Sequence, residues 1–206
     1  MNEQETFWAG AQGDAYTNRN RVNWLLRVPF WTDVIAMTGA KRIMEVGCNF
    51  GANLLALRTI NPHLNLFGID INDYARRQAS SLGLDVMEST ALSYFNWLEN
   101  AKKIFGDANP NDLIFTSGVL IHISPESLRA EMQAILDLSR HYVLCIEYAA
   151  DKEEEVEYRG EMQRLWRRDY GALYQELCPQ LTLMHKWHLD KSQGFDDCTA
   201  WLFSKP

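Results

Sequence analysis

Short apolar runs alternate with stretches of helical periodicity along most of this 206-residue chain. Strands are predicted at 42–46, 64–70, 84–88, 112–117 and 142–148, and helices at 52–60, 72–83, 94–105, 124–139 and 161–177. Such alternation indicates an α/β fold, with a mostly parallel sheet covered by helices on both faces. Two last strands, at 181–187 and 199–204, have no helix between them, so we expect an antiparallel C-terminal pair. The prediction is therefore a seven-stranded, mostly parallel sheet.

Length, charge and cysteine usage narrow the class of protein. The length suits a single domain over 1–206, and the net charge of -7 disfavours a nucleic-acid binder. The start of the chain has no basic-then-apolar leader, and no apolar run reaches the roughly 18 residues of a membrane span. The four cysteines are scattered without a C-x-x-C pair, which predicts reduced thiols in a cytoplasmic protein and no metal site.

A tight turn is predicted where the first strand gives way to the first helix, in "EVGCNFGANL". Gly47 and Gly51 frame this turn, and Asn49 stands where a dinucleotide fingerprint has its middle glycine. Ala52 replaces the third glycine, so a pyrophosphate ligand is disfavoured. Glu45 lies just before the turn and suits a cationic or amine-bearing ligand.

Asp70 ends the second predicted strand, 19 residues after Gly51. A carboxylate at this place accepts hydrogen bonds from both ribose hydroxyls of a nucleoside, although capping of the next helix is the alternative. The turn and Asp70 together predict a ligand with an adenosine ribose, an amine and no pyrophosphate. S-adenosylmethionine (SAM) meets these conditions, and its carboxylate suits backbone N–H groups.

The run "EVGCNFG" followed by "GIDIND" resembles the class I SAM-dependent methyltransferases, over residues 41–204. Three further segments are similar to the methylases associated with pseudaminic acid biosynthesis and other surface-sugar clusters: "FWAGAQGDAYTNRN" (7–20), "FTSGVLIHISPE" (115–126) and "YRGEMQRLWRRDYG" (158–171). The resemblance implies a Rossmann-like fold, SAM as cofactor and methyl transfer to a small, anionic, sugar-derived or phosphorylated acceptor.

The resemblance also implies where the cofactor lies. Ile71 would cover the adenine, and Glu88, Ser89 and Thr90 would bond its edge, unless they only begin a helix. The remaining cofactor contacts are expected from Glu45, Gly47, Cys48, Asn49, Gly51, Asn53, Asp70 and Ser117. Cys48 is expected to be a small packing residue rather than a nucleophile, because no charged partner is evident.

The resemblance also implies that residues 1–38 form a helical cap over the cofactor. Tyr16 and Arg19 would then reach the methionine carboxylate, Arg19 by a charge-assisted pair, with Trp8 packed in the cap. The alternative is a helix docked on the core in which Trp8 and Tyr16 are merely buried.

Methyl transfer from a sulfonium needs an acceptor held in line with the methyl group, and a hydroxyl acceptor usually needs a base. His122 follows the fourth predicted strand and has a suitable pKa, although it could instead only order the loop. Glu147 and Tyr148 end the fifth strand at the same edge of the sheet. They either face the acceptor or form a solvated strand end.

A cluster of arginines in an acidic chain is the remaining signal. Tyr158, Arg159 and Arg168 are candidates for binding an anionic acceptor, because guanidinium groups suit carboxylate and phosphate. The alternative is a solvated helix face paired with the acidic run at 151–157.

Three other functions compete with a small-molecule methyltransferase. A macromolecule methyltransferase, on RNA, DNA or protein, is disfavoured by the acidic charge and by "TSGVLIH", which lacks the N/D-P-P-aromatic turn of adenine and cytosine N-methylases. Asn49 disfavours an NAD-dependent oxidoreductase. A non-catalytic SAM-binding protein stays open, as does the oligomeric state.

Overall fold

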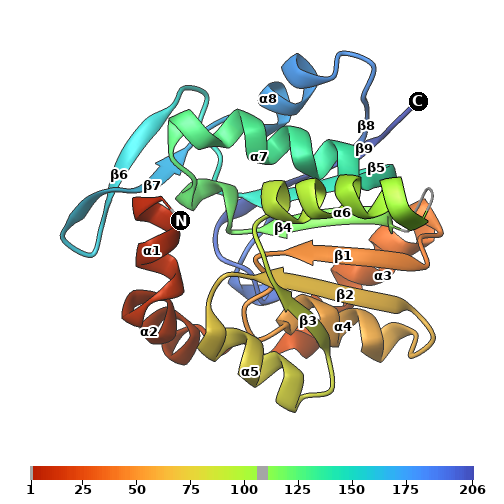
Figure 1. Ribbon diagram of the computed structural model, residues 1–206, viewed down its shortest axis with the longest axis horizontal. Coiled ribbons are helices and arrows are strands. Elements are labelled where there is room, and N and C mark those ends of the chain that lie inside the picture. Colours follow the sequence, from red (N-terminus) through yellow and green to blue (C-terminus); the bar gives the residue numbers. More distant parts are fainter. Residues whose placement is uncertain (1, 106–110) are drawn as a thin grey trace.

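The computed structural model describes residues 2–105 and 111–206 and is built on a seven-stranded sheet in the order β3-β2-β1-β4-β5-β9-β8 (Figure 1). Its strands are β1 (Arg42–Val46), β2 (Asn65–Asp70), β3 (Asp85–Glu88), β4 (Asn111–Ser117), β5 (Ser139–Glu147), β8 (Thr182–Leu189) and β9 (Cys198–Ser204). The first five pair in parallel, and β9 runs antiparallel to both β5 and β8. The predicted α/β sheet and its antiparallel C-terminal pair are confirmed.

Helices cover both faces of the sheet (Figure 1). They are α3 (Val28–Thr38), α4 (Ala52–Ile60), α5 (Asp73–Ser81), α6 (Ala91–Phe105), α7 (Pro125–Leu138) and α8 (Tyr170–Leu177). Neighbouring strand residues point to opposite faces, so Ile43 packs with the layer of α3 and α4 whereas Met44 packs with that of α6 and α7. The central strands therefore contain uninterrupted apolar stretches, 113–115 in β4 and 143–146 in β5, because both of their faces are buried.

The helix predicted at 161–177 is wrong over its first half. Residues Glu161–Arg167 form β7, which pairs antiparallel with β6 (Glu154–Tyr158) outside the main sheet. The cause is the turn at Arg159 and Gly160, whose φ angles of 55° and 85° fit a two-residue hairpin turn rather than a helix. The helix α8 begins only at Tyr170, where the Asp169 side chain accepts from the Ala172 N–H.

Two short N-terminal helices, α1 (Glu3–Ala9) and α2 (Ala11–Arg19), form a cap at the end of the sheet toward which the β1 and β2 arrows point (Figure 1). The cap is fastened to the β6–β7 hairpin, because Glu3 pairs with Arg164 at 2.7 Å and Gln4 donates to the Gln163 carbonyl. Of the expected cap at 1–38, the stretch 28–38 is instead the core helix α3, whose Phe30, Trp31 and Val34 are buried.

The cap is also docked on α5 through Gly13, which leads to a first prediction. A Cβ at Gly13 would lie 1.9 Å from the Trp8 carbonyl oxygen and 2.6 Å from Asn72 Nδ2. We expect Gly13→Ala to undock the cap and to speed proteolytic cleavage within residues 1–20 by about tenfold or more, since cleavage tracks local opening. The control is Gly10→Ala, whose added methyl meets nothing closer than 3.3 Å. Equal cleavage of both variants would contradict this docking.

Among the described residues, no helix is both long enough and apolar enough to cross a membrane.

Candidate active site

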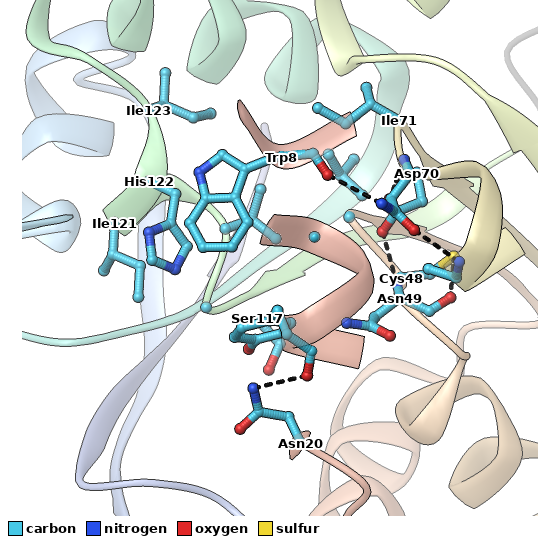
Figure 2. A pocket seen from close by; sticks show the side chains of 18 of the residues that line it. Trp8, Asn20, Cys48, Asn49, Asp70, Ile71, Ser117, Ile121, His122 and Ile123 are labelled. Atoms are coloured by element: carbon cyan, nitrogen blue, oxygen red, sulfur yellow. Dashed lines mark hydrogen bonds between the residues drawn. The ribbon is translucent and has the colours of Figure 1, made fainter. Parts of the chain in front are cut away.

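A cavity of about 400 Å³ lies between the carboxyl ends of the parallel strands and the cap (Figure 2). The residues predicted from the sequence that line it are Tyr16, Arg19, Glu45, Gly47, Cys48, Asn49, Asn53, Asp70, Ile71, Ser89, Thr90, Ser117, His122, Tyr148, Tyr158 and Arg159. They come from the N-terminal cap, from the ends of five strands and from the hairpin. The topology therefore gathers residues that are up to 143 positions apart in sequence.

The glycine turn forms the floor of the cavity. Gly47 and Cys48 both donate their N–H to the Ile69 carbonyl, at 2.7 and 3.0 Å, which ties the turn to the end of β2. Gly47 has φ of 67°, and a Cβ there would lie 2.4 Å from the Val119 side chain. Gly51 does not line the cavity; its Cβ would collide with Leu84 at 2.1 Å, so this glycine serves the packing of α4.

Asp70 is held by two backbone donors. Its Oδ2 accepts from the Asn49 N–H and its Oδ1 from the Asn72 N–H, each at 2.8 Å (Figure 2). Each carboxylate oxygen can still accept a further hydrogen bond from a ligand. Burial raises the pKa of Asp70, while the two backbone hydrogen bonds oppose that shift. The cap of α5 is Asn72, which accepts from the Ala75 N–H, so the capping alternative for Asp70 is wrong.

Glu45 has one oxygen bonded and one free. Its Oε1 accepts from Asn53 Nδ2 at 2.6 Å, whereas its buried Oε2 has no hydrogen-bond partner. The residue is only 2% exposed, and burial raises the pKa of Glu45 to about 8. The bond from Asn53 and the charge of Arg27 counter this shift, and Asp70 adds to it. A cationic group beside Oε2 would satisfy that oxygen and favour the carboxylate.

Aromatic rings close the cavity on the side of the cap. The Trp8 ring faces that of His122 (Figure 2), with 4.2 Å between the ring centroids. The Trp8 centroid lies 5.6 Å from those of Tyr16 and Tyr158. Arg19 Nη2 donates to the Tyr158 hydroxyl at 2.6 Å, which joins α2 to the hairpin. These contacts make the cap and the hairpin one cover over the cavity.

His122 is neutral in this environment. Its Nδ1 lies 2.7 Å from the Arg164 carbonyl oxygen, and burial lowers the pKa of His122 to about 4. A carbonyl only accepts, so we assign the proton to Nδ1, which leaves Nε2 as a hydrogen-bond acceptor. At neutral pH His122 can orient an acceptor hydroxyl or amine, but it is a weak base.

Besides Gly51, three residues expected at the site lie outside the cavity: Glu88, Glu147 and Arg168. Glu88 is exposed and pairs with Arg76 at 2.7 Å. Glu147 is fully buried behind the wall, where it accepts from the N–H groups of Val119 and Ile121 at 3.2 and 3.4 Å. Burial raises its pKa to about 7. Glu147 therefore orders the loop after β4 rather than facing an acceptor.

The arginine stretch is mostly engaged within the protein. Arg168 has a side chain only 2% exposed, which donates to Glu153 at 2.6 Å and to the Ile123 carbonyl at 3.3 Å. Arg167 pairs with Glu154 at 3.5 Å. Of the arginines in the stretch 158–171, Arg159, exposed at the tip of the hairpin, is the one that lines the cavity. The acidic run at 151–157 thus supplies partners to Arg167 and Arg168, as the alternative interpretation expected, but on a hairpin and with Arg168 buried rather than on a solvated helix face.

Sequence reasoning did not identify Arg27 and Asp196 as site residues, and both line the cavity. The Tyr148 hydroxyl donates to Asp196 Oδ2 at 2.9 Å. A second cavity of about 480 Å³ is lined in part by the same Tyr148, Asp196 and Cys198, so the two cavities adjoin there. Neither Arg27 nor Asp196 belongs to a motif, and no local signal could have marked them.

Within the described part of the chain, no group of three His, Cys, Asp or Glu side chains is arranged to hold a metal ion.

Comparison with known proteins identifies the architecture. No protein-family model and no curated protein sequence matches the chain. Magnesium protoporphyrin IX methyltransferase from Synechocystis PCC 6803, solved with S-adenosylhomocysteine (SAH), superposes with a TM-score of 0.69 at 11% identity, covering 98% of each chain. Plantazolicin methyltransferase, in complex with a triazolic desmethyl analogue and SAH, gives a TM-score of 0.68 at 12% identity, over 99% of this chain and 95% of that one.

A third similar structure is the 1,6-didemethyltoxoflavin-N1-methyltransferase of Burkholderia thailandensis, solved with its substrate and SAH. It gives a TM-score of 0.66 at 14% identity, over 98% of this chain and 86% of that one. At these identities the likeness concerns the fold. This chain has the Rossmann-like fold of the class I SAM-dependent methyltransferases.

Proposed function

We propose that this protein is a SAM-dependent methyltransferase that acts on a small-molecule acceptor. The observation that carries the proposal is the unpartnered, buried Oε2 of Glu45, which sits in one cavity with Asp70 and the glycine turn. An amine-bearing nucleoside without a diphosphate is the ligand that these groups fit. Each of the three similar enzymes described above was solved with SAH bound, which agrees with this choice.

Different residues would hold the different parts of SAM. Asp70 would accept from the ribose hydroxyls, and Glu45 would accept from the ammonium. Ile71 would cover the adenine, with Ser89 and Thr90 at its edge. Arg19 would meet the carboxylate while it also bonds Tyr158. The expected contact from the N–H groups of the glycine turn is not proposed, because residues 47–51 already donate to Ile69, Asp70, Asn49 and Cys48. Cys48 packs in the turn, and burial holds its pKa well above the ordinary value, so it stays a neutral thiol.

When bound, SAM supplies an electrophilic methyl group, and the protein's task is to place the acceptor in line with it. The acceptor would reach the methyl from the junction of the two cavities. There Asp196, oriented by Tyr148, can accept a hydrogen bond from a hydroxyl or amine of the methyl acceptor. His122 Nε2 can accept a second such hydrogen bond. The aromatic cover of Trp8, Tyr16 and Tyr158 would exclude water from this space.

We further propose an anionic, sugar-derived acceptor in a cytoplasmic setting, as in the methylases associated with pseudaminic acid. Arg159 supports this choice, because it is the arginine of the 158–171 stretch that lines the cavity. The similar proteins of known structure act on a toxoflavin precursor, a porphyrin and a plantazolicin precursor, so small molecules are the common feature. The free thiols of Cys48, Cys145, Cys178 and Cys198 agree with a reducing compartment.

The cofactor choice is tested by calorimetric titration of the purified protein with SAM, SAH and NAD. We expect one site for SAM and for SAH, and no measurable binding of NAD. Saturable NAD binding without SAM binding would replace the methyltransferase with a dehydrogenase.

His122 provides a prediction for turnover. We expect His122→Ala to lower turnover by about tenfold or more, because it removes an acceptor for the substrate proton and support for Trp8. The affinity for SAM should change by less than about threefold. Because the pKa of His122 is lowered to about 4, turnover of the parent protein should show no inflection at the ordinary histidine pKa near 6.5. The control is His63→Ala, because His63 is an exposed histidine in a loop. Unchanged turnover in His122→Ala would show that His122 has only a structural role.

A further inference from the structure

We propose that Arg27 and Trp31 are positioning residues that fix the amide of Asn53, and through it the oxygen that Glu45 presents to the cofactor ammonium. The inference rests on the proposed SAM site. It assigns a role to two residues that precede the sheet and contribute nothing to the glycine turn itself. It also ties the cofactor side of the cavity to the loop that carries Asp196.

The orientation of the Asn53 amide follows from its neighbours. Its Oδ1 lies 2.8 Å from Arg27 Nη1 and 3.2 Å from Trp31 Nε1. Guanidinium and indole nitrogens can only donate, so both require the amide oxygen on their side. The amide nitrogen is thereby turned to Glu45. Asn53 is 2% exposed and Trp31 0%, so bulk water does not compete for these bonds.

The orientation of Asn53 then decides what Glu45 offers. Because Nδ2 donates to Oε1 at 2.6 Å, the carboxyl group is held by one oxygen, and Oε2 is left for the cavity. A protonated Glu45 carries its proton on Oε2, since Oε1 already faces a donor. Proton and ligand ammonium therefore compete for the same oxygen, and binding of the ammonium releases the proton.

The charge of Arg27 acts on the same carboxyl group. The titratable groups that face Glu45 are Arg27 before α3, Asp70 at the end of β2 and the neutral thiol of Cys48 in the turn. Arg27 favours the carboxylate and Asp70 opposes it. Without Arg27, the carboxylate would face Asp70 with no compensating cation.

Arg27 also reaches the acceptor side. Its Nε donates to the Gly194 carbonyl at 2.9 Å, and its guanidinium lies 4.4 Å from the centroid of the Phe195 ring. Those residues lead directly into Asp196, whose carboxylate accepts from Tyr148. One guanidinium thus bonds both the amide that sets Glu45 and the loop that lines the acceptor junction.

The test measures SAH binding and the protons it releases, by calorimetry in buffers of different ionisation enthalpy. SAH is chosen because it has the same amino-acid end as SAM and cannot transfer a methyl group. The parent protein should release about half a proton at pH 8, because the pKa of Glu45 is then near the buffer pH. Arg27→Met should release about one proton at pH 8 and should bind SAH roughly tenfold more weakly at pH 7.

Two further variants separate position from charge. Arg27→Lys keeps the charge and should return the proton release toward the parent value, whereas Trp31→Phe keeps Arg27 and should weaken SAH binding with little change in proton release. Arg58→Met, at a partly buried arginine of α4 that bonds the Leu82 and Gly83 carbonyls outside the cavity, is the control and should match the parent protein.

The outcomes are distinct. A larger proton release in Arg27→Met, restored in Arg27→Lys, supports the proposal. Unchanged proton release in a folded Arg27→Met protein would overturn it, even if affinity falls. Failure of the parent protein to bind SAH would remove the proposed SAM site itself, and the positioning roles with it.

Discussion

Replacing Asp70 with alanine is expected to weaken SAM binding at least about tenfold. The carboxylate would accept from both ribose hydroxyls, and a hydrogen bond to a charged group contributes about 1.5–3 kcal/mol. Loss of about 1.4 kcal/mol is already a factor of ten in affinity. The variant also leaves the N–H groups of Asn49 and Asn72 without their acceptor, so the glycine turn loses its support. Calorimetric titration with SAM measures the effect.

The matched control for Asp70→Ala is Asp73→Ala. Asp73 opens α5 three residues later, its side chain is 62% exposed, and it pairs with Arg76 and Arg77 outside the cavity. It should bind SAM as the parent protein does. Near-parent affinity in a folded Asp70→Ala protein would remove the ribose assignment.

Glu45→Gln is expected to lower the affinity for SAM by an amount that grows with pH. Burial raises the pKa of Glu45 to about 8, and a bound ammonium would lower it, so binding below pH 8 releases a proton. The parent affinity should therefore rise about tenfold per pH unit as the pH approaches 8, since one pKa unit is about 1.4 kcal/mol. Glutamine resembles the protonated acid, so the variant should stay flat over pH 6–8.

Stability separates this effect from misfolding. The folded-state pKa of Glu45 lies above its ordinary value of 4.5, so the folded protein holds this proton more tightly than the unfolded chain. Burial of the ionised form then costs stability, and that cost grows as the pH rises from about 4.5 toward 8. In the absence of SAM, Glu45→Gln should accordingly unfold no more easily than the parent protein at pH 8.

Glu147→Gln is the control for Glu45→Gln, because Glu147 is a buried carboxyl group that does not line the cavity. Its variant should keep the rise of SAM affinity with pH. If Glu45→Gln keeps that rise as well, Glu45 does not meet the ammonium.

Much of the fold was predictable because its signals are local. The central strands of the parallel sheet are buried on both faces, so stretches such as 113–115 and 143–146 are apolar without interruption. Gly47 needs φ of 67° and a close approach to Val119, and these demands leave a glycine visible in the sequence. The turn and Asp70 could therefore be placed at one cavity before any coordinates.

The errors arose where tertiary contacts decide the structure. Residues Glu161–Arg167 have helix-compatible composition, but the Arg159–Gly160 turn and pairing with β6 make them a strand. The arginines of that stretch were ambiguous, because composition does not show which cation already has a carboxylate partner. Arg168, buried against Glu153, illustrates this.

Arg27 and Asp196 were missed for a related reason. They lie 169 positions apart and meet only because the segment before α3 packs on the β8–β9 connection, where Arg27 bonds the Gly194 carbonyl. Nothing in their neighbouring residues marks a site. Such contacts follow from the assembled fold, not from spacing along the chain.

Methyl transfer to a small molecule can be measured directly. We would incubate the purified protein with methyl-labelled SAM and a cell extract, and separate the products through a small size cut-off. We predict label in the small fraction, with Asp70→Ala giving far less. Label retained with macromolecules would contradict the small-molecule acceptor, and nuclease or protease digestion would identify the polymer. No label in either fraction, despite SAM binding, would indicate a SAM-binding protein without catalysis.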